Sequence, residues 1–142
     1  MRPLLFLSLL FLASSCGAKK TSSSYEMGKT TRADVIAVKG PPVSEVTNPV
    51  PDSTTIKYQN GESFQLKGDL VVNRFADPVA EEKTILWWKH KFKNCRTRTT
   101  QLELEPGSHT PPEIEFACPA EGMAVIYTQG SDSVSRVVQF EK

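Results

Sequence analysis

The chain has 142 residues, of which 39% are hydrophobic and 23% are charged, a composition that excludes a polytopic membrane protein and a disordered tail. Its 17 Lys and Arg residues nearly balance its 16 Asp and Glu residues. Because a nearly neutral chain has no field that would hold a polyanion, nucleic-acid binding is not expected as its main task.

Residues 1–15 have the pattern of a cleaved export signal. Arg2 supplies a positive charge, and residues 4–12 read LLFLSLLFL. Nine helical residues span about 13 Å, whereas the hydrocarbon core of a bilayer is about 30 Å thick. The run is therefore too short for a stable transmembrane helix and is typical of a secretion signal. Without this segment 127 residues remain, a length that suits one domain.

The small residues Ala13, Ser14 and Ser15 precede Cys16 and Gly17. This stretch resembles the lipobox of bacterial lipoproteins, although that family prefers Leu where this chain has Ala13. The resemblance implies that Cys16 becomes an acylated amino terminus carrying palmitate, and two or three acyl chains anchor a protein firmly. It also implies an outer-membrane lipoprotein that faces the periplasm, because Gly17 is not the Asp that typically signals inner-membrane retention. The alternative is a plain secretory signal followed by an incidental cysteine.

The cysteine count is odd, with three in the chain. Lipidation of Cys16 would leave Cys95 and Cys118 as a natural pair. An oxidising compartment favours a disulfide, and closing a loop of about twenty-four residues would stabilise the fold by about 3 kcal/mol. The alternatives are a redox pair, which lacks a Cys-x-x-Cys motif, and a metal site with His90 and His109, which lacks closely spaced ligand pairs. We therefore expect no metal and no cofactor.

Residues 16–27 are small, polar and patternless, as in a flexible tether. Lys19 and Lys20 lie where lipid headgroups would be, and each would add about 1 kcal/mol of attraction to an anionic membrane. A solvated leader without membrane contact is the alternative.

A short helix is predicted at residues 31–39. Thr31 can cap its start, and Asp34 suits its first turn. Gly40 stands where a helix ends, and the following Pro41-Pro42 forbids continuation. Because so short a helix is unstable alone, it is expected to pack on the strands that follow.

Residues 43–53 contain Pro49 and Pro51 and are predicted to form a loop. The next segments alternate in strand fashion and are separated by glycine turns at residues 60–61 and 68–69. We predict an antiparallel meander of three strands, at residues 54–58, 63–67 and 70–75.

The caps and turns of residues 28–78 resemble those of the SmpA/OmlA (BamE-like) family of small outer-membrane lipoproteins. The matching positions are Gly28, Thr31, Val35, Gly40 and Pro42. Gly28 lies one residue further upstream than in the family, and Lys39 replaces an apolar residue that is common there. The resemblance implies a non-catalytic role in envelope integrity or in the assembly of β-barrel proteins. The helix-plus-meander plan also occurs in secreted protein inhibitors, so it does not fix the partner.

Strands are also predicted in the second half of the chain. Lys89, Lys91 and Lys93 alternate with aromatic residues in segment 83–98, which is strand periodicity. Pairing of these lysines with glutamates on neighbouring strands would set the register. Those glutamates are Glu103, Glu105, Glu113 and Glu115, and the remaining strands are expected at residues 99–105, 113–118, 123–128 and 134–140. The sequence of the last hairpin resembles that of the first. The likeness has two possible origins, a degenerate internal repeat or the composition that strands share.

The dipeptide Trp87-Trp88 is the candidate for a binding site. Adjacent strand residues face opposite ways, so one ring should be buried and the other exposed or covered. One interpretation places both rings in the core. Another makes them a partner-binding hot spot surrounded by cations, or a contact for anionic headgroups. These cations are Lys89, Lys91, Lys93, Arg96 and Arg98, and simple pairing with the glutamates is the remaining alternative.

No catalytic constellation is present in the sequence. No serine lies in a Gly-x-Ser-x-Gly motif, and neither histidine lies in a recognisable catalytic motif. We expect a non-catalytic outer-membrane lipoprotein that acts as a periplasm-facing binding or scaffold module, with an envelope protein as partner and no small-molecule substrate. The alternative is a periplasmic protein inhibitor or ligand-binding protein that uses the second half.

The expected fold class is α+β, with one short helix packed on an antiparallel β-meander and a second β-rich half with one disulfide. The expected organisation is a signal peptide at residues 1–15, a tether at 16–27, the family-like unit at 28–78 and the β-rich half at 79–142. The last two segments are expected to be continuous within one domain.

Overall fold

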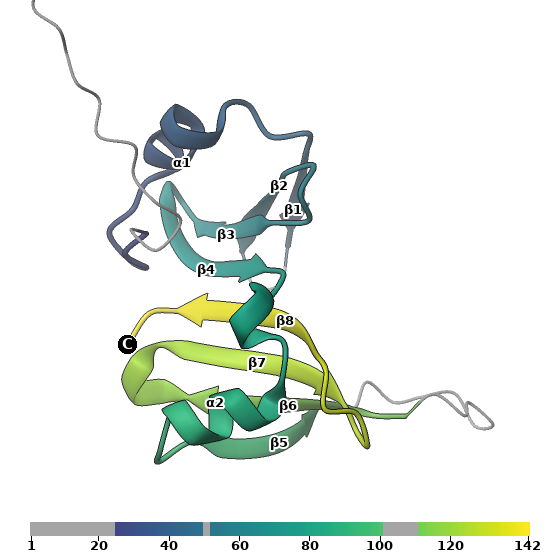
Figure 1. Ribbon diagram of the computed structural model, residues 1–142. Coiled ribbons are helices and arrows are strands. Elements are labelled where there is room, and N and C mark those ends of the chain that lie inside the picture. The colour runs from purple at the N-terminus through teal and green to yellow at the C-terminus, as the bar shows by residue number, and fades with distance from the viewer. Residues whose placement is uncertain (1–24, 50–51, 101–110) are drawn as a thin grey trace, which may run out of the picture.

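The computed structural model describes residues 25–49, 52–100 and 111–142. Its strands form one antiparallel sheet in the order β1-β2-β3-β4-β8-β7-β6-β5 (Figure 1). The first half of the chain contributes α1 (Arg32–Lys39), β1 (Ser44–Asn48), β2 (Ser53–Lys57), β3 (Ser63–Lys67) and β4 (Leu70–Ala76). The second contributes the 3-10 turn η2 (Ala80–Glu82), α2 (Ile85–Lys91), β5 (Arg96–Thr100), β6 (Glu113–Cys118), the 3-10 turn η3 (Pro119–Glu121), β7 (Met123–Thr128) and β8 (Val134–Phe140).

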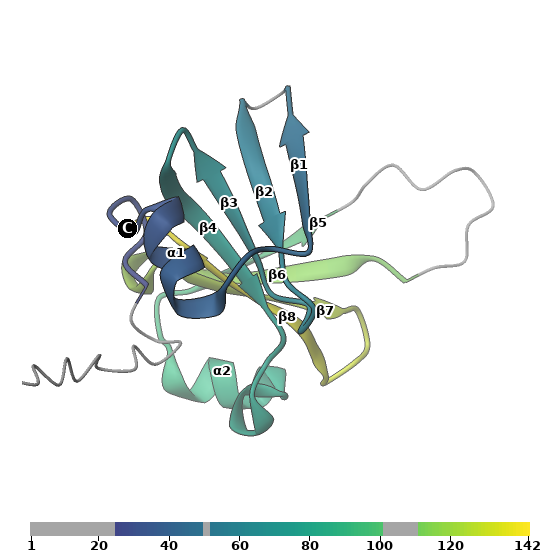
Figure 2. The same cartoon turned by 90° about the horizontal axis from the view of Figure 1, so that it is seen from above.

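The predicted architecture of one helix on a three-stranded meander, followed by a second β-rich half, is wrong. The described residues form a single eight-stranded sheet with two α-helices. The halves join because β4 pairs with β8, from Asn73 opposite Phe140 to Ala76 opposite Val137. In each half the strands run in chain order from one edge of the sheet to this seam. The sheet twists, so that β1–β4 cross β5–β8 at a clear angle (Figure 2).

The loop predicted at residues 43–53 contains a strand. β1 pairs with β2, from Ser44 opposite Lys57 to Asn48 opposite Ser53. β1 lies at the edge of the sheet, and four of its five residues are exposed. It therefore lacks the apolar alternation by which a half-buried strand is recognised.

The strand predicted at residues 83–98 is wrong for its central part, where the helix α2 occupies Ile85–Lys91, and β5 begins only at Arg96. Thr84 caps α2, because its hydroxyl oxygen accepts a hydrogen bond from the backbone N–H of Trp87 at 3.4 Å. Ile85 and Trp88 are the buried residues of α2. Their spacing of three residues places them on one side of a helix, which the alternation of lysines and aromatics obscures.

The helix predicted at residues 31–39 is confirmed. The Thr31 hydroxyl oxygen accepts a hydrogen bond from the N–H of Asp34 at 3.2 Å, and the Asp34 carboxylate accepts one from the N–H of Thr31 at 2.9 Å. This reciprocal pair is a capping box. Gly40 ends the helix with a positive φ of 81°, a region that favours glycine.

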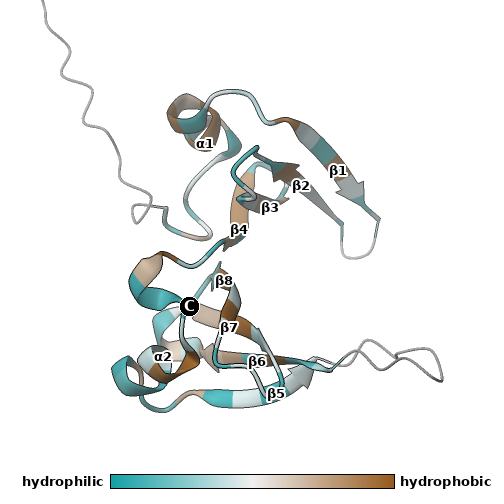
Figure 3. Ribbon diagram, turned by 45° about the vertical axis from the view of Figure 1, so that its right-hand side comes forward, coloured by the Kyte–Doolittle hydropathy of each residue, from teal (hydrophilic) through white to brown (hydrophobic). Residues whose placement is uncertain are grey.

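Both helices lie on the same face of the sheet. One buried cluster joins α1 to the first half and contains Val35, Ile56, Phe64, Leu66 and Val71. The other joins α2 to the second half and contains Ile85, Trp88, Phe116, Cys118, Val125, Val134 and Val137. The hydrophobic colour in α2 and in the strands beside it marks this second cluster in Figure 3. Arg74 is the register partner of Phe64 on β3 and of Gln139 on β8. Because register partners point to the same face of a sheet, both buried clusters lie on one continuous face that crosses the seam.

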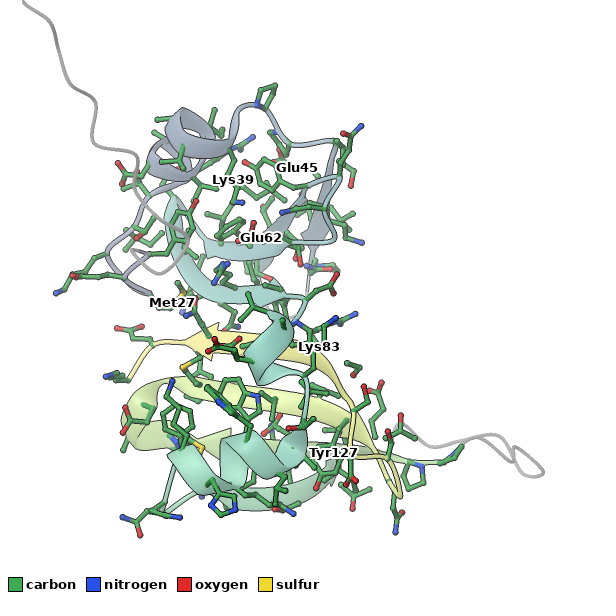
Figure 4. The ribbon with its side chains drawn as sticks, viewed as in Figure 1. Met27, Lys39, Glu45, Glu62, Lys83 and Tyr127 are labelled. Carbon is green, nitrogen blue, oxygen red and sulfur yellow. A yellow bond between two sulfur atoms is a disulfide. The ribbon has the colours of Figure 1, made fainter. Side chains whose placement is uncertain are left out.

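A buried carboxylate holds the first cluster to the seam. Glu62 is only 3% exposed and forms ion pairs with Lys39 of α1 and with Arg74 of β4, the latter at 2.6 Å. Lys39 and Glu62 lie between α1 and β3 in Figure 4. Burial raises the pKa of Glu62, but hydrogen bonds from Lys39 and Arg74 outweigh it, so that the pKa lies below its ordinary value.

Within residues 25–49, 52–100 and 111–142, neither helix is long and apolar enough to cross a membrane.

Candidate functional site

The sheet has an open face, which we define as the face opposite α1 and α2. Side chains alternate between the two faces of a strand, so the residues between the buried positions point to the open face. No helix of the described segments packs there, because both helices belong to the clusters of the other face. One row of register partners crosses this face from edge to edge: Ser44, Lys57, Ser63, Phe75, Val138, Ala124, Ala117 and Arg96.

A hollow of about 690 Å³ lies on the open face and extends from β4 across β8, β7 and β6 to β5. Ala117 and Ala124 are direct register partners on β6 and β7. Because their side chains end at Cβ, the surface is low between the longer side chains around them. The apolar residues that line the hollow are Phe75, Ala117, Pro119, Ala124, Ile126, Val138 and Phe140.

Arginines from two different strands border this hollow. Arg98 forms a two-pronged ion pair with Glu115, at 2.7 and 3.0 Å, and this pairing raises the pKa of Arg98. Arg96 and Arg136 also line the hollow and are exposed. Neither forms an ion pair with another residue in the described part of the chain. The hollow therefore offers two guanidinium groups that can bind carboxylates from outside.

The open face has a different character over the first half. Gln65 donates a hydrogen bond from Nε2 to the Ser53 hydroxyl at 3.0 Å and accepts one at Oε1 from Asn73 at 2.7 Å. The amide of Asn48 likewise donates to the Thr55 hydroxyl at 3.2 Å. Each of these three amides therefore forms a hydrogen bond within the sheet, Asn73 with Gln65 and the others with hydroxyl groups. The apolar floor beside the two arginines lies on the seam strand β4 and on the strands of the second half.

The structure separates the residues predicted around Trp87-Trp88. Trp88 is 1% exposed, stacks on Phe92 and donates its indole N–H to the Glu82 carbonyl at 2.8 Å. Trp87 is half-buried, and the Lys91 ammonium lies 4.3 Å from its ring centroid. Lys89, Lys91 and Lys93 are exposed on and just after α2, whereas Arg96 and Arg98 line the hollow on the other side of the sheet.

The predicted lysine–glutamate pairing is wrong where the structure describes it. Glu115 pairs with Arg98, its register partner on β5. Lys89 and Lys91 belong to α2 and Lys93 lies just after it, so none of the three is on a strand. Glu103 and Glu105 lie outside the described residues.

The predicted disulfide between Cys95 and Cys118 is confirmed, with 4.3 Å between the two Cα atoms. It joins the segment after α2 to the end of β6. Cys16 and His109 lie outside the described residues, and His90 is exposed on α2. No group of three or more His, Cys, Asp or Glu side chains suited to a metal ion occurs in the described ranges.

The hollow was not predicted, although the sequence contains a signal for it. Strand 123–128 reads MAVIYT, and Phe75, Val138 and Phe140 also occupy positions that alternation assigns to the open face. Apolar residues on both faces of a strand indicate that both faces are covered or bind something.

Comparison of the chain with models of protein families, with curated proteins and with solved structures found no match. The resemblance to the SmpA/OmlA family stays a prediction.

Proposed function

We propose that this chain is an exported, non-catalytic protein that is anchored by lipid on Cys16 and binds another protein through the hollow on its open face. The observation that supports binding is an apolar floor beside two unpaired arginines, on a sheet face that no described helix covers. An apolar centre with arginine around it is the composition of a protein–protein hot spot.

The breadth of the hollow favours a protein over a small molecule. It extends over five neighbouring strands, whereas small-molecule sites enclose most of the ligand surface. A convex segment of a partner can place an apolar side chain over Ala117 and Ala124. Carboxylates beside that side chain can then reach Arg96 and Arg136.

The proposed location is the periplasmic face of the outer membrane. Its support is the signal-like segment of residues 1–15 with Cys16 after it, together with a disulfide of the kind that exported proteins keep. A binding module held there would serve as a scaffold in envelope integrity or in the assembly of outer-membrane proteins. In that role it should co-purify from detergent with β-barrel proteins.

The second candidate is a periplasmic protein inhibitor. The position of the hollow, which lies mostly on strands of the second half, favours it, because a depression in a rigid sheet can receive the protruding loop of an enzyme. An inhibitor would keep full activity as a soluble chain without the acylated Cys16, whereas a scaffold would lose its function when released from the membrane.

Crosslinking capture from native membranes tests the proposal. Arg136→Glu inverts an exposed charge at the hollow, and Lys67→Glu makes the same inversion at the β3–β4 turn, outside the hollow. The unmodified chain and Lys67→Glu should capture a common protein that Arg136→Glu does not. Capture of the same proteins by all three chains, or of none by any, would contradict the proposal.

A further inference from the structure

The outer side of α2 is a second surface with unusual composition. Ile85 and Trp88 point to the core, so the helical rotation of 100° per residue directs Leu86 and His90 away from it. Trp87 lies at the border, because its half-buried ring packs against the core cluster on one side. Leu86 is 61% exposed. An exposed leucine next to a half-buried tryptophan forms a small apolar ridge on the outside of the molecule.

Lysines surround this ridge. Lys83, Lys89, Lys91 and Lys93 are all exposed, and none forms an ion pair within the described segments. Lys83 directly follows η2 and precedes the cap of α2, and Figure 4 labels it beside η2. The acidic residues near the start of α2 are Glu81 and Glu82 of η2 and Asp132, whose carbonyl accepts a hydrogen bond from the N–H of Ile85. Four lysines against three carboxylates leave this surface with a net positive charge. The Lys91 ammonium rests over the Trp87 ring, which keeps cation and aromatic side chain together.

This combination matches the chemistry of a bilayer interface. Tryptophan and leucine enter the boundary between headgroups and acyl chains, while lysine ammoniums extend to the phosphates. We infer that the outer side of α2 docks on an anionic membrane surface. Phosphate groups of acidic lipids complement the four ammoniums, which form no ion pair with a carboxylate of the described segments.

The position of α2 in the fold agrees with this orientation. α2 packs on the face of β5–β8 opposite the hollow, so membrane contact leaves the hollow free for a protein. Eight residues separate Cys16 from Tyr25, and an extended segment of that length reaches about 30 Å. The length of the tether matters for docking only if Cys16 carries the proposed lipid anchor. Docking of α2 on a membrane requires neither that anchor nor protein binding at the open face.

Tryptophan fluorescence in vesicles tests the inference, because the chain has two tryptophans, Trp87 and Trp88. The intact chain from its host envelope is mixed with vesicles of phosphatidylcholine, with or without about a third phosphatidylglycerol. Brominated acyl chains in the vesicles quench a ring that enters the bilayer. We expect quenching in the anionic vesicles, little in the neutral ones, and its loss in Trp87→Phe, since Trp88 is buried.

Charge variants separate docking from folding. Lys89→Gln combined with Lys93→Gln should lower the docking equilibrium constant about thirtyfold, since each lysine near an anionic surface contributes about fivefold. Lys67→Gln should leave it unchanged. Equal quenching in both vesicles, absence of quenching in the anionic ones, or insensitivity to the double substitution would overturn the inference. A photocrosslinker at residue 90 that captures an acidic protein and no lipid would overturn it as well.

Discussion

Arg74 of β4 donates a hydrogen bond from Nη1 to Oε1 of Gln139 on β8, at 2.8 Å, across the seam that joins the two halves of the sheet. The same guanidinium binds Glu62 through Nε at 2.6 Å. Arg74 therefore joins the seam to Glu62, the residue before β3, and Glu62 in turn pairs with Lys39 of α1. The open face depends on this seam, because the hollow begins at β4 and continues onto β8.

Glu62→Gln should destabilise the fold. The substitution leaves Lys39 and Arg74 without their carboxylate, and both side chains are mostly buried, with 19% and 12% exposure. We expect a loss of about 2 kcal/mol in the free energy of unfolding, below the range for fully buried pairs because water still reaches the lysine. Urea unfolding measures it. Arg32→Gln, which breaks the exposed pair with Glu45, is the matched control and should cost less than about 1 kcal/mol. Equal losses for the two variants would contradict the stabilising role given to the buried Glu62 carboxylate.

The Glu62 network should also make stability depend on pH. The pKa of Glu62 is lower in the folded chain than its ordinary value of 4.5, so below that value the unfolded chain binds more protons than the folded one. The stabilisation is complete above the unfolded pKa and is lost as pH falls through the folded pKa. The urea midpoint of the native chain should therefore fall further on acidification than that of Glu62→Gln. Parallel pH profiles would show that Glu62 does not cause this dependence.

The two tryptophans should differ in their contribution to stability. Trp88→Ala removes a buried ring and its hydrogen bond to Glu82, and should cost about 3–5 kcal/mol. Trp87→Ala removes a half-buried ring and should cost about 1–2 kcal/mol. Thermal unfolding followed by circular dichroism compares them. A larger loss for Trp87 would contradict the placement of Trp88 in the core.

Removal of the disulfide should lower stability without changing the open face. Cys95 and Cys118 are 23 residues apart in sequence, and a closed loop of that length stabilises by about 3 kcal/mol on the chain-entropy model. A Cys95→Ala, Cys118→Ala double variant should unfold at correspondingly lower urea. It should still capture the partner of the open face at a temperature where it is folded. Loss of capture by the folded variant would mean that the disulfide shapes the hollow.

Local signals in the sequence predicted part of this structure. The Thr31–Asp34 capping box, the strands from β2 to β4 and from β6 to β8, and the disulfide are confirmed. Each depends on residues near one another in sequence or on a simple count of cysteines. In segment 83–98 the lysines fit a period of two while Ile85, Trp88 and Phe92 fit a helix, so periodicity alone could not decide.

The open face could not be predicted from such signals. It requires the β4–β8 seam, in which Asn73 pairs with Phe140 and Phe75 with Val138. No turn or cap near these residues specifies that contact, because they are more than sixty positions apart in the chain. The alanines of β6 and β7 form a hollow only once larger side chains from β4 and β8 stand beside them.

The most direct measurement is site-specific photocrosslinking in living cells, with a crosslinking amino acid placed at residue 136 beside the hollow or at residue 67 at the β3–β4 turn. Binding through the open face predicts a discrete protein adduct from position 136 and none from position 67. No adduct from position 136, or the same adducts from both positions, would contradict the proposed binding of a protein at the hollow.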